Sequence, residues 1–159
     1  MNSRPAALGE LIGASLHRVP GPVAEHRNEG RRVLASAREF RHTAQLCRDN
    51  NLRLPVISNL HEAARLAVTA VAASKGLRFA NRPGAHVAAV DYALAVDLVN
   101  RVEWTQLDQL RDLRHKANYP SDLVEPTSAE LDQFTNLADS VIVRAQQTVA
   151  SIPPPPPRP

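Results

Sequence analysis

Residues 107–119, which read Leu-Asp-Gln-Leu-Arg-Asp-Leu-Arg-His-Lys-Ala-Asn-Tyr, concentrate side chains suited to phosphate chemistry. Two arginines, a histidine, an amide and a phenol lie within nearly three helical turns, namely Arg111, Arg114, His115, Asn118 and Tyr119. A guanidinium can hold a phosphate through two parallel hydrogen bonds, and an imidazole can give or take a proton near neutral pH. This segment is therefore the strongest functional candidate in the sequence.

The same segment has the spacing of a helix with one buried face. Apolar residues recur three and four positions apart, at Leu107, Leu110, Leu113 and Ala117. Pro120 discourages helix at the residue before it. At roughly 100° per residue, Arg114 lies only about 45° from the centre of the apolar stripe. Because a long cation beside a core is costly unless it is paired or placed at an interface, we expect Arg114 to face a partner or a cleft.

The remaining sequence predicts an all-α fold, an up-and-down bundle of four to five main helices. Alanine is frequent and there are only six glycines, a composition that favours helix. Helical periodicity predicts a short helix near 7–16 and main helices near 23–49, 56–74, 85–100, 103–119 and 128–150. We divide the chain into an N-terminal segment (1–21), the bundle (22–151) and a disordered or polyproline proline-rich tail (152–159).

The charge of the chain is +3, with a pI of about 9.6, and arginines are dense in the first long helix. Three of them, Arg31, Arg38 and Arg41, are candidates to bind an RNA backbone. Two simpler explanations are a solvated helix face and a GC-rich coding sequence. Because the last helix is acidic, it is also predicted to neutralise the first, within the fold or across subunits.

Several function classes have no support in the sequence. Cys47 is the single cysteine, so an intramolecular disulfide and a cysteine-based metal site are excluded. The six histidines do not have the spacing of a metal-binding helix, and no phosphate-binding loop is present, so we expect neither metal nor cofactor. No apolar run approaches the roughly 20 residues needed to cross a membrane, and no secretory signal begins the chain, which favours a cytoplasmic protein.

Several short segments of the sequence resemble segments of small bacterial HEPN-domain proteins. They are His61-Glu62-Ala63-Ala64-Arg65-Leu66, Gly76-Leu77-Arg78, Pro83-Gly84-Ala85-His86 and the segment from Leu110 to Tyr119. The resemblance covers about residues 25–150. It implies an up-and-down helical bundle that often forms a homodimer. It also implies metal-independent ribonuclease activity in active members, some of them toxins paired with an antitoxin of nucleotidyltransferase type.

The motif of that family is an arginine, then a polar residue, then a histidine separated from the arginine by four to six residues. Arg114 matches the arginine and His115 the polar residue, but the expected histidine position is held by Tyr119, Pro120 or Ser121. In a second alignment Arg111 is the arginine and His115 the histidine, with only three residues between them.

The sequence therefore leaves three functions open. The first is a ribonuclease acting as a toxin or defence effector, with Arg111 and Arg114 on phosphate, His115 as acid or base, Asn118 orienting and Tyr119 donating a proton. The second is a noncatalytic HEPN-like module that binds RNA, nucleotide or a partner protein. In the third, the arginines only pair with neighbouring acids to hold the bundle together.

Overall fold

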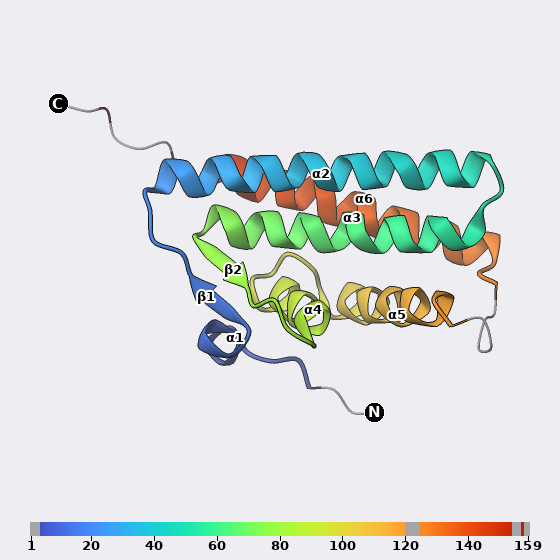
Figure 1. Cartoon of the computed structure of the whole chain (residues 1–159), viewed down its shortest axis with the longest axis horizontal. Helices are drawn as coiled ribbons and strands as arrows, with labels where there is room; N and C mark the ends of the chain where they lie inside the picture. The colour runs from blue at the N-terminus through green and yellow to red at the C-terminus, as the bar shows by residue number, and fades with distance from the viewer. Residues whose placement is uncertain (1–3, 120–124, 154–156, 158–159) are drawn as a thin grey trace.

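A computed structural model describes residues 4–119, 125–153 and 157. Within these residues the chain forms six helices and a small two-stranded sheet (Figure 1). In chain order the elements are α1 (Leu8–Ala14), β1 (Leu16–Arg18), α2 (Val23–Asp49), α3 (Arg53–Ser74), β2 (Leu77–Phe79), α4 (Ala85–Ala95), α5 (Arg101–Ala117) and α6 (Ser128–Ser151). The helical prediction is confirmed. The prediction of an entirely α fold is wrong, because the structure also contains the two short strands β1 and β2.

Helices α2 and α3 form the long antiparallel pair that supports the other elements (Figure 1). Asn51 takes a positive φ of 58° in the turn between them. The two helices are in close contact at Gly30. A side chain added to that glycine would collide with Ser74 of α3. Helix α6 packs against both α2 and α3, and the interface buries Phe134, Val141 and other apolar residues of α6.

The boundaries of three helices differ from those predicted. Helix α3 begins at Arg53 rather than 56, which leaves Pro55 in the first turn, where its missing N–H is tolerated. Helix α4 ends at Ala95 rather than 100, because Asp97 adopts a φ of 56° and breaks the helical path. Helix α5 ends at Ala117, two residues before the predicted end.

The N-terminal segment packs onto the helices through the two strands. In the antiparallel pair, Leu16 lies opposite Phe79 and Arg18 opposite Leu77. Leu16 is almost fully buried and belongs to the core. Helix α1 is kinked, because Ile12 and Gly13 leave helical φ and ψ values. The proline-rich tail prediction falls largely on residues 154–156 and 158–159, outside the described residues.

Charge pairing between α2 and α6 confirms the predicted neutralisation, and it occurs within the chain. Arg41 pairs with Asp139 at 2.6 Å, and Arg48 pairs with Asp132 at 2.5 Å. Both arginine side chains are less than a third exposed. Two of the arginines in α2 therefore neutralise carboxylates of α6.

Three polar contacts fix the position of α5, the helix with the candidate residues. Asn100 and Glu103 form a capping box, with hydrogen bonds of 2.9 Å in both directions. Arg144 of α6 donates to Glu103 at 2.7 Å. The indole N–H of Trp104 donates to Asp91 of α4 at 3.0 Å, and the other carboxylate oxygen of Asp91 accepts the N–H of Ala6 at 3.1 Å. The start of α5 is therefore tied to α4 and α6.

Candidate functional site

Arg114, the arginine predicted to border the core, faces α3. Its side chain is 35% exposed, and its Nη2 atom lies 3.9 Å from Oε1 of Glu62. Arg111, one turn earlier, donates to Asp108 of its own helix at 2.9 Å. The expectation that Arg114 needs a partner is met by a carboxylate. The pairing of Arg111 with Asp108 is the contact that the third hypothesis described.

His115, Asn118 and Tyr119 lie on the exposed side of the end of α5. The rings of His115 and Tyr119 are 5.1 Å apart, and both residues are exposed. Asn118 is the C-cap of the helix, and its side chain makes no hydrogen bond with a described residue. An imidazole and a phenol are thus held next to each other in solvent. Arg114 and His115 are neighbours in sequence but point to different surroundings, since successive helix positions differ by about 100°.

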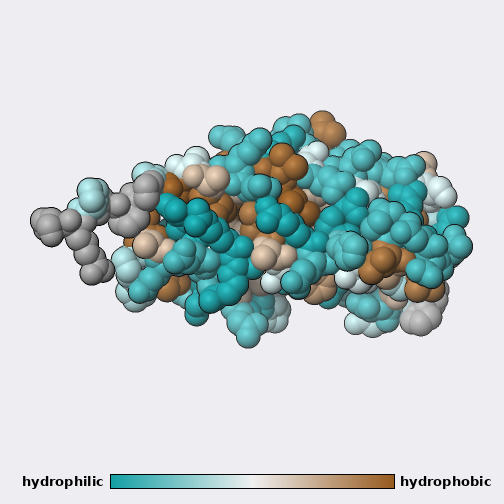
Figure 2. Space-filling model, turned by 90° about the horizontal axis from the view of Figure 1, so that it is seen from above, coloured by the Kyte–Doolittle hydropathy of each residue, from teal (hydrophilic) through white to brown (hydrophobic). Residues whose placement is uncertain are grey.

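The three arginines predicted to bind RNA do not share one environment. Arg31 and Arg38 are exposed and form no ion pair with a described residue. Arg41 is half-buried and holds Asp139 with two hydrogen bonds. The face seen from the side of α2 is mostly hydrophilic, with small separate apolar patches (Figure 2). A polyanion approaching this face would meet Arg31 and Arg38 before Arg41.

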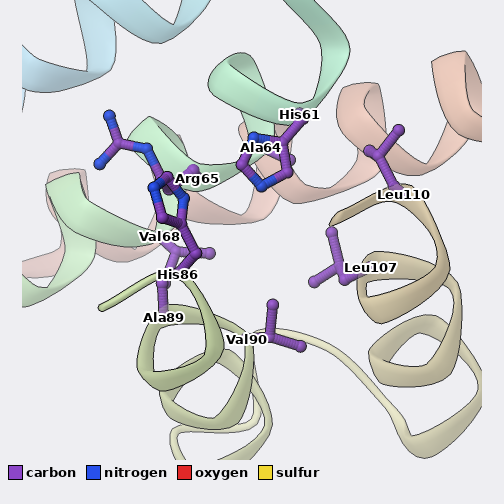
Figure 3. A pocket seen from close by; sticks show the side chains of 9 residues that line it. All are labelled: His61, Ala64, Arg65, Val68, His86, Ala89, Val90, Leu107 and Leu110. Atoms are coloured by element: carbon purple, nitrogen blue, oxygen red, sulfur yellow. The ribbon is translucent and has the colours of Figure 1, made fainter. Parts of the chain in front are cut away.

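Sequence analysis missed a second group of candidate side chains, from α3 and the start of α4. The rings of His61 and His86 lie beside each other in the lining of a narrow pocket, with their centroids 5.3 Å apart (Figure 3). Arg65 lines the same pocket and donates to Oε2 of Glu62 at 2.7 Å. His61 is buried and 6% exposed, while His86 and Glu62 are half-buried. Arg114 joins this group through Glu62.

Two imidazole nitrogens in this group lack a hydrogen-bond partner among the described residues. Nδ1 of His61 and Nδ1 of His86 are inaccessible to solvent and make no hydrogen bond with a described residue. Nδ1 of His61 lies 3.5 Å from Oε1 of Glu62, but the orientation of the ring does not form a hydrogen bond. An unsatisfied buried polar group costs about 1–3 kcal/mol, so this arrangement needs an explanation.

Burial and neighbouring charges shift the pKa values of Glu62 and His86. The neighbouring imidazole of His61, together with hydrogen bonds from Arg65, lowers the pKa of Glu62 to about 2 although burial opposes the shift. Burial lowers the pKa of His86, and the charges of His61, Arg65 and Arg114 lower it further. Near neutral pH Glu62 is therefore a carboxylate and His86 a neutral imidazole, which can act as an acceptor or a ligand.

Sequence reasoning missed this group because its members belong to different helices. His61 follows Leu60 on the helix face that packs against the other helices, and it offered a signal as a polar residue at a core position. His86 lies in the first turn of α4, which begins directly after Gly84. Their contact depends on how α4 packs against α3, which spacing within one helix cannot reveal.

A comparison with family models matches residues 31–149 to the HEPN domain. This match covers most of the chain and confirms the resemblance of its short sequence segments to the HEPN domain. The chain belongs to the HEPN-domain family. A comparison with curated proteins and a comparison with solved structures gave no significant match.

The HEPN match includes every residue of the two clusters described above. It begins within α2, after α1 and β1, and ends near the end of α6. None of the helices in the described ranges has the length and apolarity needed to cross a membrane. The HEPN domain thus supplies the helical framework that carries both clusters.

Proposed function

We propose that this HEPN protein is a metal-independent endoribonuclease that acts as a toxin or defence effector. One observation supports the proposal above all. The end of α5 holds His115 and Tyr119 with their rings 5.1 Å apart in solvent, and the same helix supplies Arg114, which faces α3. These are the groups that metal-free cleavage of RNA requires, two proton-transfer groups and a cation for the phosphate.

Each side chain has a role in the proposed reaction. A base, His115, removes the proton of the ribose 2′-OH, whose oxygen attacks phosphorus, and the bond from phosphorus to the 5′ oxygen breaks. Tyr119 donates its proton to that leaving oxygen, and the products are a 2′,3′-cyclic phosphate and a 5′-hydroxyl end. Arg114 and Arg111 stabilise the charge on the pentacoordinate phosphate, while Asn118 orients it.

A homodimer would complete the site. Each chain offers one histidine at the end of α5, and a twofold axis beside this helix would bring two copies together. The second imidazole could then replace the phenol as the acid. The exposure of His115, Asn118 and Tyr119 leaves this surface open to such a partner, or to an antitoxin of nucleotidyltransferase type.

A separate surface on α2, which does not pack against α5, would bind the RNA away from the cleavage site. Arg31 and Arg38 are exposed and are proposed to hold its phosphates. Arg41, the third candidate, would first have to leave Asp139.

The test is digestion of RNA by the full chain in the presence of EDTA. Wild type should cleave, Arg114→Ala and His115→Ala should each lose about 10²- to 10⁴-fold in rate, and Tyr119→Phe should also lose activity. His42→Ala is the matched control, because His42 is an exposed histidine of α2, a helix that does not pack against α5. The proposal fails if wild type cleaves no RNA, or if Arg114→Ala and His115→Ala cleave as fast as the control.

A second candidate function is a noncatalytic HEPN module that binds RNA, nucleotide or a partner protein. It is favoured by the pairing of Arg111 with Asp108 and of Arg114 with Glu62, together with Tyr119 in place of the motif histidine. This function predicts binding without turnover, with an affinity that falls as salt rises. Binding that ignores salt, or that fails for every polyanion tested, would exclude it.

A further inference from the structure

Three side chains between α3 and α4 have the chemistry of metal ligands. His61, Glu62 and His86 each offer one donor atom, and these atoms all lie within 4.8 Å of one another. Two donors come from adjacent positions of one helix and the third from the start of another. Figure 3 shows the two imidazoles beside each other in the lining of the pocket.

The unpartnered nitrogens limit what can bind there. Nδ1 of His61 and Nδ1 of His86 are closed to solvent, which disfavours a bulky ligand such as a nucleotide at these atoms. A single ion is small enough to bind one ring nitrogen of each histidine together with the carboxylate. We propose that His61, Glu62 and His86 bind one divalent transition-metal ion, of the zinc class, and that this ion fastens the start of α4 to α3.

The donor set selects the class of ion. Neutral imidazole and carboxylate together suit zinc, cobalt and nickel, whereas magnesium and calcium take oxygen donors. Zinc–nitrogen bonds of about 2.0–2.1 Å place tetrahedral ligands about 3.3 Å apart. Because the donor atoms of the three residues lie within 4.8 Å, they must close by at most about 1.5 Å, which side-chain rotation can supply.

Two arginines near the carboxylate shape the affinity. Arg65 is hydrogen-bonded to Oε2 of Glu62, which orients the carboxylate and leaves Oε1 for the ion. Arg114, 3.9 Å from Oε1, competes for that oxygen and repels a cation. Since the Arg114 side chain is partly exposed, it can turn into solvent when the ion binds. Removing its charge should therefore strengthen metal binding.

The experiment is calorimetric titration of the metal-stripped full chain with zinc chloride, repeated with cobalt to record the visible bands of tetrahedral cobalt. We expect one ion per chain and a higher melting temperature with zinc. His86→Gln and His61→Gln should each weaken binding by more than about 100-fold, since even residues that only orient ligands contribute 10- to 100-fold. Arg114→Gln should bind several-fold more tightly. His42→Gln is the matched control and should bind as wild type does.

Circular dichroism of each variant checks the fold, and His86→Gln is informative even if the buried His61→Gln does not fold. The proposal is overturned if wild type binds no zinc or cobalt, or if His86→Gln binds as tightly as the control. It is also overturned if cobalt bound to wild type lacks the tetrahedral bands. The readout is metal binding, so its failure is separate from failure of the ribonuclease test in EDTA.

Discussion

Arg41 of α2 grips Asp139 of α6 with two hydrogen bonds, of 2.6 and 3.2 Å, although the residues are 98 positions apart in sequence. Paired hydrogen bonds between a guanidinium and a carboxylate have fixed geometry, so this contact aligns the two helices as well as attracting them. An arginine expected to meet RNA thus joins two helices of the fold.

A double-mutant cycle should measure this contact. Because Asp139 is about half exposed, the coupling between Arg41→Ala and Asp139→Ala should be only about 0.5–1 kcal/mol in urea unfolding. Arg38→Ala, which removes an arginine without an ion pair to any described residue, should change the free energy of unfolding by less than about 0.5 kcal/mol. A coupling of zero would show that the pair does not form in solution.

The exposed arginines of α2 should govern the salt dependence of RNA binding. Arg31→Ala and Arg38→Ala should each reduce the slope of log affinity against log salt by about one unit. Fluorescence anisotropy with a labelled single-stranded RNA at several KCl concentrations measures the slope. Glu39→Gln, which alters charge on the same helix without removing an arginine, is the control. An unchanged slope in both arginine variants would place the RNA elsewhere.

Gly30 should tolerate no side chain. A Cβ there would lie 2.7 Å from Cβ of Ser74 and 2.9 Å from the carbonyl oxygen of Ala70, so α2 and α3 would have to separate. Gly30→Ala should destabilise the chain by about 1–3 kcal/mol in thermal or urea unfolding. The matched control is Gly9→Ala, a helical position with open space around it, which should be neutral or slightly stabilising. Equal effects would mean that the helices are farther apart.

The tie between α5 and α6 should depend on pH. The hydrogen bond from Arg144 lowers the pKa of Glu103 below its usual 4.5 in the folded chain. A carboxyl with a lowered folded pKa adds stability that is complete above its unfolded pKa and is lost as the pH falls through the folded one. Glu103→Gln should therefore cost about 0.5–1 kcal/mol at neutral pH, a figure reduced because Arg144 is partly exposed.

The cost of Glu103→Gln should shrink as the pH falls below about 4.5. Urea unfolding across the acid range measures it. Glu39→Gln, at an exposed carboxylate without an ion pair to a described residue, should show no such trend. A Glu103 effect independent of pH would show that the carboxylate has no special interaction.

Local signals predicted the long helices well. Pro22 before α2, and the capping box of Thr127 and Glu130 at α6, are contained in a few consecutive residues, and both helices begin where expected. The strands were missed because each has three residues and exists only through its partner, so Leu77–Phe79 has no periodicity of its own. Asp97, where α4 stops early, breaks the helix through a backbone angle that its neighbours do not reveal.

In the candidate site, too, features of a single helix were predictable from the sequence and contacts between helices were not. The helical angle placed Arg114 correctly beside the core, since that estimate used one helix alone. Its acidic partner Glu62, and the meeting of His61 with His86, depend on the packing of three helices. Such contacts arise from tertiary structure and leave no mark in spacing along the chain.

Asp91 bridges two parts of the protein, accepting the backbone N–H of Ala6 with one oxygen and the indole of Trp104 with the other. Trp104 is the single tryptophan of the chain, and Arg101 lies over its ring. Tryptophan fluorescence therefore comes from one site, at which the N-terminal segment around Ala6 meets α4 and α5. Undocking of that segment would change the emission without any label, so the chain carries its own optical reporter of whether its first residues are in place.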